Sequence, residues 1–223
     1  MTTERAEAFL DDTPGEPRVR GFLHRAAGPD GLILTHGASG NCESPLLVAL
    51  AETFAAAGLA VLRCDLPFRQ LRPHGPPKGA MGKTDQEGLR RAVSVLRALI
   101  TGRIFLGGQS YGGRQASMLA ASASCPLDGL LLLSYPLHPP GKPANLRTAH
   151  FPGLRIPVLF VQGTRDPFGS VEEMHSAIKL IPAATKLLLA EGEGHSLVSK
   201  RNRDQLPTAV LKAARAFWGP PDG

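Results

Sequence analysis

The sequence lacks the features that mark membrane, secreted and disulfide-stabilised proteins. No segment approaches the ~20 apolar residues that span a bilayer, so we expect no membrane partner. The first fifteen residues carry five charged side chains and no apolar stretch typical of a signal peptide. The only three cysteines, Cys42, Cys64 and Cys125, have the spacing of neither a disulfide framework nor a zinc site. We therefore expect free thiols and a reducing compartment, the cytoplasm.

Aromatic residues are also scarce, at 5% of the chain, although the net charge is +6. A basic balance can indicate nucleic acid, a membrane surface or an anionic substrate. Because no basic run is interleaved with aromatic residues, we interpret the charge as a solvated arginine-rich surface and expect no nucleic-acid partner. One loop-rich stretch is an exception, where basic side chains cluster: Arg63, Arg69, Arg72, His74, Lys78 and Lys83.

Short apolar runs alternate with longer stretches of helical spacing. We predict core strands at residues 32–35, 60–64, 103–106, 129–133, 157–162 and 186–190, and one leading strand at 18–24. We predict helices at 44–57, 84–100, 110–124, from 170 to before Pro182, and 206–218, with capping boxes at 84–87 and 170–173. This alternation predicts an α/β fold, with a mostly parallel central sheet and helices on both faces.

A length of 223 residues fits one domain. We expect a mobile leader over residues 1–16 and a single α/β domain over 17–223. The longest irregular stretches, residues 66–83 and 135–156, are often where function lies in a compact domain. The second is too short for a separate lid domain, so we expect an open site roofed by these two loops. The oligomeric state stays undetermined.

A glycine-rich motif, LGGQSYGG at residues 106–113, lies between a predicted strand and a predicted helix. A serine in this context occupies a strained turn that exposes its hydroxyl at the carboxyl edge of the sheet. Gly108 and Gly112 allow the strand and helix to approach closely. The alternatives are a turn that merely packs, or a phosphate-binding loop, whose Lys and Ser/Thr are missing here. We predict that Ser110 is a nucleophile.

A serine hydroxyl needs a base, and the base needs an orienting acid. The motifs QGTRDP at 162–167 and EGEGHS at 191–196 each follow a predicted strand. They place Asp166 and His195 at the edge that holds the serine, in the chain order Ser, Asp, His. Taken singly, Asp166 is explained equally well by a turn before Pro167 as by catalysis, and His195 could simply lie on the surface. The occurrence of all three residues at one sheet edge, in the required order, favours catalysis.

Four other residues compete for the acid and base roles: Asp65, Asp128, His36 and His138. Asp128 precedes its strand and so lies at the wrong end of the sheet. Asp65 follows a strand but comes too early in the chain order. His36 better suits a structural role, because the motif THGASG at 35–40 ends the first core strand.

Such a His-Gly turn supplies one backbone N–H of an oxyanion hole, and the residue after the nucleophile supplies the second. We assign these donors to Ala38 and Tyr111, with Gly37 as the alternate to Ala38, and we expect His36 to brace the loop. Further side chains predicted near the substrate are Arg69, Arg72, Arg114 and His138. Their charges indicate an anionic or polar substrate. The alternative is that Arg69 and Arg72 only anchor the loop through salt bridges.

The order of THGASG, GGQSYGG, QGTRDP and EGEGHS resembles the α/β-hydrolase superfamily over residues 31–218. Three further segments, RCDLPFR at 63–69, SYPLHPPGK at 134–142 and PVLFVQG at 157–163, resemble a narrower branch. This is the dienelactone-hydrolase-related group of small hydrolases akin to animal testis-expressed (Tex-type) and NSL-complex-subunit (KANL-type) proteins. The resemblance implies a minimal α/β-hydrolase fold, with its N-terminal antiparallel strands reduced to one, and a Ser–Asp–His site.

The resemblance implies no particular substrate. Ser110 stands where dienelactone hydrolases carry Cys, so their chemistry does not carry over. We expect a serine hydrolase that cleaves an ester, thioester or similar acyl bond of a small molecule, without a metal or organic cofactor. Some animal members of the branch resemble scaffold components. A non-catalytic binding protein therefore stays an alternative, as does an acyltransferase.

Overall fold

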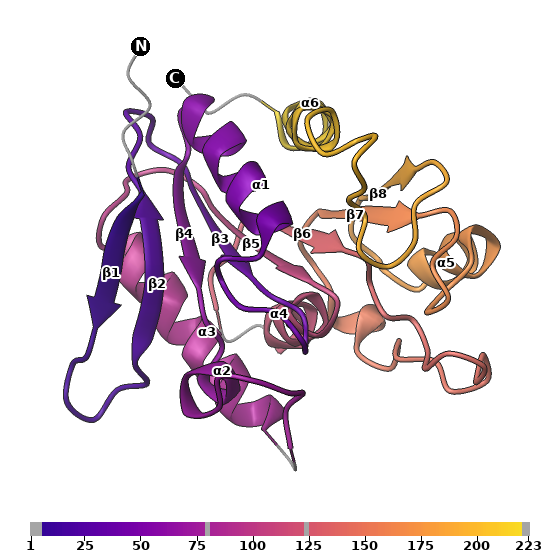
Figure 1. The fold of residues 1–223 in the computed structure, drawn as a ribbon, viewed down its shortest axis with the longest axis horizontal. Helices are drawn as coiled ribbons and strands as arrows, with labels where there is room; N and C mark the ends of the chain where they lie inside the picture. The colour runs from indigo at the N-terminus through magenta and orange to yellow at the C-terminus, as the bar shows by residue number, and fades with distance from the viewer. Residues whose placement is uncertain (1–5, 79–80, 123–124, 220–223) are drawn as a thin grey trace.

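A computed structural model describes residues 6–78, 81–122 and 125–219 of the chain. Its centre is an eight-stranded sheet with the order β1-β2-β4-β3-β5-β6-β7-β8 (Figure 1). The strands are β1 (Glu7–Asp11), β2 (Val19–His24), β3 (Gly31–Thr35), β4 (Ala60–Cys64), β5 (Ile104–Gln109), β6 (Gly129–Leu133), β7 (Val158–Gly163) and β8 (Thr185–Ala190). Strands β3 to β8 run parallel, and β2 is antiparallel to both of its neighbours, β1 and β4.

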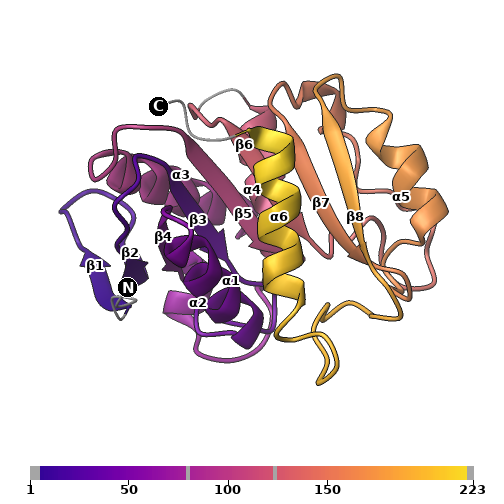
Figure 2. The same ribbon diagram turned by 90° about the horizontal axis from the view of Figure 1, so that it is seen from above.

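Helices cover both faces of the sheet (Figures 1 and 2). They are α1 (Pro45–Ala56), α2 (Pro67–Leu71), α3 (Gly82–Arg97), α4 (Tyr111–Ala121), α5 (Val171–Ile178) and α6 (Leu206–Trp218), with a short 3₁₀ turn η1 (Phe151–Gly153). One face packs against α1 and α6, and the other packs against α3, α4 and α5. The structure confirms the predicted α/β class, with a mostly parallel sheet between helices.

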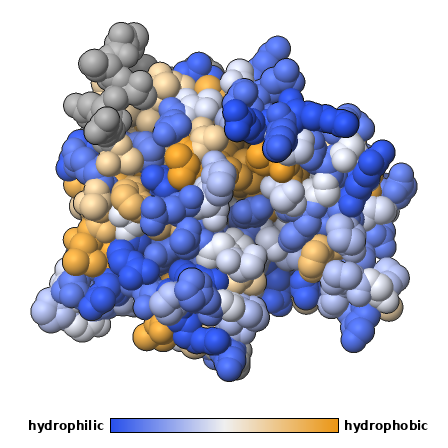
Figure 3. Space-filling model, viewed as in Figure 1, coloured by the Kyte–Doolittle hydropathy of each residue, from blue (hydrophilic) through white to orange (hydrophobic). Residues whose placement is uncertain are grey.

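Successive residues of the central strands point to opposite faces of the sheet and pack into two separate apolar cores. In β3, Leu32 and Leu34 face the layer of α1 and α6, whereas Ile33 faces the opposite layer, and all three are fully buried. Burial on both sides explains why these strands read as unbroken apolar runs. The face in Figure 3 is largely hydrophilic, and apolar side chains show in a recess between α1 and α6. No helix among the described residues is long and apolar enough to cross a membrane.

Two local predictions differ from the structure at the start of the chain. Residues 7–11, expected in a mobile leader, form β1, which pairs with β2 along its whole length. The sheet therefore begins with two antiparallel strands rather than one. An edge strand obtains much of its stability from backbone hydrogen bonds, which leave little trace in the side-chain pattern. Only Phe9 of this strand packs against the core. Residues 1–5 of the expected leader lie outside the described part.

The capping box expected at residues 84–87 does not form. Helix α3 begins two residues earlier, at Gly82, and has no side-chain cap. Thr84 and Glu87, the two residues of the expected box, therefore lie inside the helix rather than at its start. Asp85 between them is fully buried, and its carboxylate accepts the N–H of Phe68 at 3.0 Å and the hydroxyl of Tyr111 at 2.6 Å. The second expected box does form at the start of α5, where Ser170 and Glu173 bond reciprocally.

Candidate active site

The turn between β5 and α4 holds Ser110 in a strained conformation, with φ 51° and ψ −114°. A positive φ is rare for a residue with a side chain and is a form of strain found at functional sites. The turn requires glycine on both sides of the serine. A Cβ on Gly108 would lie 2.5 Å from the backbone nitrogen of Gly113, and one on Gly112 would lie 2.4 Å from the carbonyl oxygen of His36.

The structure brings together the three residues that the sequence assigned to one site. The Ser110 Oγ lies 2.7 Å from Nε2 of His195. On the other side of the ring, Nδ1 lies 2.8 Å from Oδ2 and 3.0 Å from Oδ1 of Asp166. Because the carboxylate accepts the proton of Nδ1, Nε2 is left free to accept the proton of the serine hydroxyl. The arrangement suits a hydroxyl that is to be activated by a general base.

Asp166 is held by two further donors. Its side chain is completely buried. Oδ1 accepts a hydrogen bond from the N–H of Phe168 at 2.9 Å, and Oδ2 accepts one from Nε2 of Gln162 at 3.0 Å. The Phe168 ring also stacks on His195, with 4.1 Å between ring centroids and an interplanar angle of 29°. Sequence reasoning missed these two supporting residues, although both lie in or directly beside the QGTRDP motif.

Ser110 and His195 open into a cavity of about 810 Å³. Its lining comprises Gly37, Ala38, Ser39, Gly40, Ser44, Pro76, Gln109, Ser110, Tyr111, Arg114, Pro136, Arg147, Phe168, His195 and Ser196. Pro76 comes from the loop after α2, and Pro136 and Arg147 come from the segment between β6 and β7. Both of the loops expected to roof the site thus contribute, and the described residues include no separate lid domain.

The residues assigned to the oxyanion hole also border this cavity. A Cβ on Gly37 would lie 3.4 Å from Cβ of Ser110, so the loop that carries Ala38 passes close to the nucleophile. Tyr111 is the first residue of α4, so its N–H has no acceptor one turn earlier within the helix. Its hydroxyl is bound to Asp85, which fixes the start of the helix. The placement suits both proposed donors, and their role stays a prediction.

A sequence profile of the family described as "Alpha/beta hydrolase domain" matches residues 29–218. The chain belongs to this family. Solved structures with the same fold include a dienelactone hydrolase from Anabaena variabilis, at 21% identity and a TM-score of 0.75, covering 97% of this chain and 98% of that one. Est1E from Butyrivibrio proteoclasticus is 19% identical with a TM-score of 0.75, covering 96% and 99%.

A third similar structure is XC6422 from Xanthomonas campestris, described as an α/β serine hydrolase without a lid. It is 18% identical, with a TM-score of 0.72, and the match covers 99% of this chain and 98% of that one. At these identities the likeness concerns the fold. Together with the family match, it identifies this chain as a small α/β hydrolase.

In this α/β hydrolase, the rival acids hold backbone groups away from the cavity. Asp128 accepts the N–H of Ile104 at the first residue of β5, the opposite end from Ser110. Asp65 accepts the N–H of Cys42 at 2.8 Å and pairs with Arg20 at 2.7 Å. Neither carboxylate lines the cavity with the serine.

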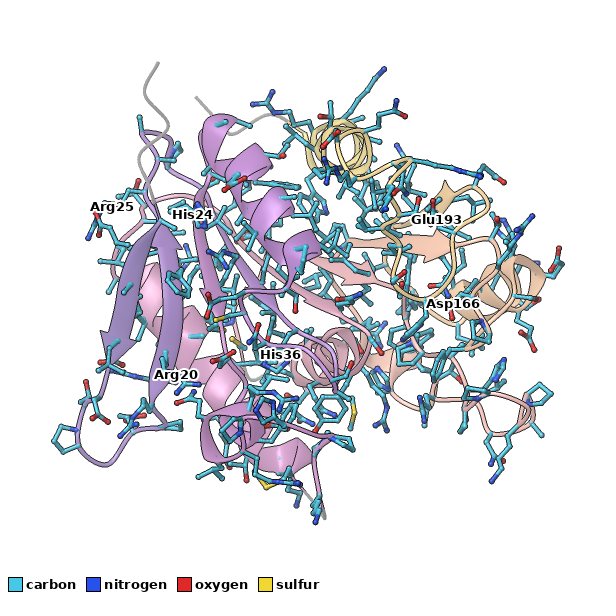
Figure 4. All side chains as sticks on the ribbon, viewed as in Figure 1. Arg20, His24, Arg25, His36, Asp166 and Glu193 are labelled. Carbon is cyan, nitrogen blue, oxygen red and sulfur yellow. The ribbon has the colours of Figure 1, made fainter. Side chains whose placement is uncertain are left out.

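The rival base His36 braces the loop, as the sequence indicated. Its Nε2 accepts the N–H of Leu66 at 3.1 Å, so the ring proton lies on Nδ1, which donates to the carbonyl of Gly37 at 2.8 Å. Complete burial lowers the pKa of His36 and favours this neutral form. Figure 4 shows His36 by the end of β3, well apart from Asp166.

The predicted substrate-loop residues of the α/β hydrolase divide into two groups. Gly37 and Arg114 line the cavity, and Arg69, Arg72 and His138 do not. Nε2 of His138 instead lies 3.2 Å from a carboxylate oxygen of Glu173, at the start of α5. The structure corrects the expectation for these three residues.

Arg69 anchors loops, and it does so through carbonyl groups rather than the salt bridges considered from the sequence. Its guanidinium donates to the backbone oxygens of Gly40 at 2.8 Å, Ala38 at 2.9 Å, and Arg72 and Gly75 at 3.0 Å. Within the described part of the chain, the Arg72 side chain makes one long hydrogen bond, of 3.4 Å, to the carbonyl of Pro76. Neither arginine lines the cavity beside Ser110. Arg147, which does, was missed because nothing in its local sequence marks it.

All three cysteines are free, and Cys42 and Cys64 are buried. Burial raises the pKa of the Cys42 thiol to about 12. A thiol held protonated in this way is a poor nucleophile, so Ser110 has no competitor here from Cys42. No group of three or more metal-binding side chains occurs among the described residues.

Proposed function

We propose that this α/β hydrolase is a serine hydrolase that cleaves an ester, thioester or similar acyl bond through an acyl-enzyme at Ser110. The observation that carries the proposal is the unbroken chain of short contacts from the Ser110 Oγ through His195 to the buried Asp166. Geometry of this kind, on three different strand ends, meets the criteria for nucleophile, base and orienting acid. Membership of a hydrolase family supports it.

In the first half of the reaction, the Ser110 Oγ attacks the carbonyl carbon of the substrate while Nε2 of His195 takes the hydroxyl proton. Asp166 keeps the other ring proton on Nδ1 and stabilises the imidazolium. The backbone N–H groups of Ala38 and Tyr111 hold the tetrahedral oxyanion, and each such donor is worth roughly 3 kcal/mol of barrier. Collapse of the intermediate breaks the acyl bond, and His195 gives its proton to the leaving group.

In the second half, a water molecule enters the position that the leaving group has vacated. Nε2 of His195 takes its proton, the hydroxide attacks the acyl carbon, and the second tetrahedral intermediate uses the same two N–H groups. The proton returns to Ser110 as the acid is released. The cavity is bordered by the two loops, with no separate lid domain among the described residues, which gives water access to the acyl-enzyme.

Within the family, we place the chain in the dienelactone-hydrolase-related branch of Tex- and KANL-type proteins, on the segments RCDLPFR, SYPLHPPGK and PVLFVQG. A similarly folded esterase from Pyrococcus furiosus supports ester cleavage. The three free thiols support a reducing compartment, the cytoplasm.

An activity-based fluorophosphonate probe tests the proposal directly. Such a probe forms a bond between phosphorus and an activated serine oxygen and releases fluoride. We expect labelling of the native protein and its loss in Ser110→Ala. Ser94→Ala, at an exposed site on α3, is the matched control and should label normally. An unlabelled native protein, or equal labelling of Ser110→Ala, would favour the scaffold alternative.

A panel of p-nitrophenyl esters of graded acyl length then measures turnover and acyl preference. We expect release of p-nitrophenol that depends on Ser110. Product analysis with added alcohols distinguishes hydrolysis from acyl transfer. Free acid as the main product supports a hydrolase, whereas a new ester formed at low alcohol concentration would indicate an acyltransferase.

A further inference from the structure

Two arginines from different elements border the cavity beside the nucleophile. Arg114 lies one turn after Ser110 on α4, and its N–H bonds to the Ser110 carbonyl at 2.9 Å. Arg147 comes from the segment between β6 and β7, where its guanidinium donates to the carbonyl of Pro136 at 3.2 Å. Two positively charged side chains therefore line the proposed substrate cavity.

Neither charge has a negative partner among the described residues. No carboxylate lies within salt-bridge distance of Arg114 or Arg147, and none lines the cavity. The Nε of Arg114 is buried, and no described residue accepts a hydrogen bond from it. Burial and the charge of Arg114 together lower the pKa of Arg147. The two cations thus repel each other at the edge of the cavity.

Arg114 and Arg147 are half-buried, and the two fully buried arginines of the described residues, Arg63 and Arg69, have partners for their guanidinium groups. The guanidinium of Arg69 donates four hydrogen bonds to carbonyl groups, and that of Arg63 donates to His24 and to the carbonyl of Cys42. Arg103, which is partly buried, pairs with Asp30 at 2.8 Å. Burying a cationic donor without a partner costs free energy. The buried Nε of Arg114, by contrast, lacks an acceptor among the described residues. A negatively charged ligand in the cavity would supply the counter-charge that both half-buried side chains lack.

We propose that Arg114 and Arg147 form an anion subsite that binds a carboxylate carried by the acyl part of the substrate. This inference rests on the proposed function, because it names the substrate class for the same serine. A carboxylate fits since its two oxygens match the planar fork of a guanidinium. The preferred substrates are esters of short dicarboxylic acids with one acid group free.

The position of Arg114 favours a short acyl chain. Arg114 lies one helical turn from Ser110, and both residues line the same cavity. A short dicarboxylic acid such as glutarate, with five carbons, is therefore the test acid.

The test compares monomethyl glutarate with methyl glutaramate, a neutral ester of the same shape in which an amide replaces the carboxylate. Methanol release gives kcat/KM for each ester. We expect the native enzyme to favour the anionic ester by about ten- to a hundredfold, as charge-assisted hydrogen bonds allow. The preference should fall to roughly threefold or less in Arg114→Met and in Arg147→Met. Arg155→Met removes an exposed charge outside the cavity and should retain the native preference.

A native enzyme that turns over both esters equally, or a preference retained in Arg114→Met and Arg147→Met, would overturn the subsite and leave the hydrolase proposal standing. Absence of fluorophosphonate labelling would instead indicate failure of the hydrolase proposal. A binding measurement keeps the subsite testable in that case. Calorimetry on Ser110→Ala should show monomethyl glutarate binding at least tenfold more tightly than methyl glutaramate, and equal binding would refute the subsite.

Discussion

The hydroxyl of Tyr111 donates a 2.6 Å hydrogen bond to the fully buried carboxylate of Asp85. Asp85 belongs to α3, and Tyr111 directly follows the nucleophile. The same carboxylate accepts the N–H of Phe68 in α2, near Arg69 and the loop that it anchors. One buried acid thus joins the nucleophile turn to the elements that position the opposite side of the cavity.

The buried carboxyl group of Asp85 should make the free energy of unfolding depend on pH. Burial raises the pKa of Asp85 above its unfolded value of 3.8, against the lowering effect of its two hydrogen bonds. A raised folded pKa contributes stability that is complete below the unfolded pKa and is lost as pH rises through the folded pKa. The unfolding free energy of the native protein, minus that of Asp85→Asn, should therefore decrease from about pH 4 upward. Urea denaturation at several pH values measures it, and a constant difference would contradict the expectation.

The nucleophile turn should not tolerate a side chain at Gly112. A Cβ there would meet the carbonyl of His36 at 2.4 Å and a methyl of Thr35 at 2.8 Å. We expect Gly112→Ala to lower the unfolding free energy by about 1–3 kcal/mol or more, the usual cost of overpacking. Gly194→Ala is the matched control, because its nearest contact would be 3.8 Å away. Equal stability of the two variants in urea would show that the turn can relax.

Arg69 should matter for both stability and turnover. Lysine cannot reproduce a fork that serves four carbonyl groups, so we expect Arg69→Lys to lower the unfolding free energy by about 1–3 kcal/mol. The ester-hydrolysis kcat should fall as well, because one of those carbonyls belongs to Ala38. In Arg72→Lys, which loses one long hydrogen bond, both quantities should stay near native values. A stable, fully active Arg69→Lys would remove the anchoring role.

The ring of Phe168 should support the charged form of His195. An imidazolium stacked on an aromatic face gains about 1 kcal/mol, and the ring also restrains the histidine. We expect Phe168→Leu to lower kcat/KM roughly three- to tenfold, whereas Phe168→Tyr retains the ring and should retain activity. The p-nitrophenyl esters provide the assay. Identical kinetics for the two variants would exclude an aromatic contribution.

Features encoded in short stretches of chain were predictable. Doubly buried strands read as apolar runs, and each motif follows such a strand directly, so parallel strands carry Ser110, Asp166 and His195 to one edge of the sheet. The chain order and glycine spacing then sufficed to select these three. The edge strand β1 was not predicted from the sequence, because its pairing depends on backbone hydrogen bonds to β2.

The roles of the charged side chains could not be read from the chain in this way. Arg69, Arg72 and Arg114 look alike in sequence. The structure shows that Arg69 donates its hydrogen bonds to backbone carbonyl groups, one of them of Ala38, far away in sequence. Arg114 instead lines the cavity together with Arg147, which lies 33 positions later in the chain. Local pattern specifies strands, helices and the turns between them, since these depend on near neighbours. The surroundings of a side chain depend on segments far away in sequence, so partners and charge balance in the site were decided by the tertiary structure.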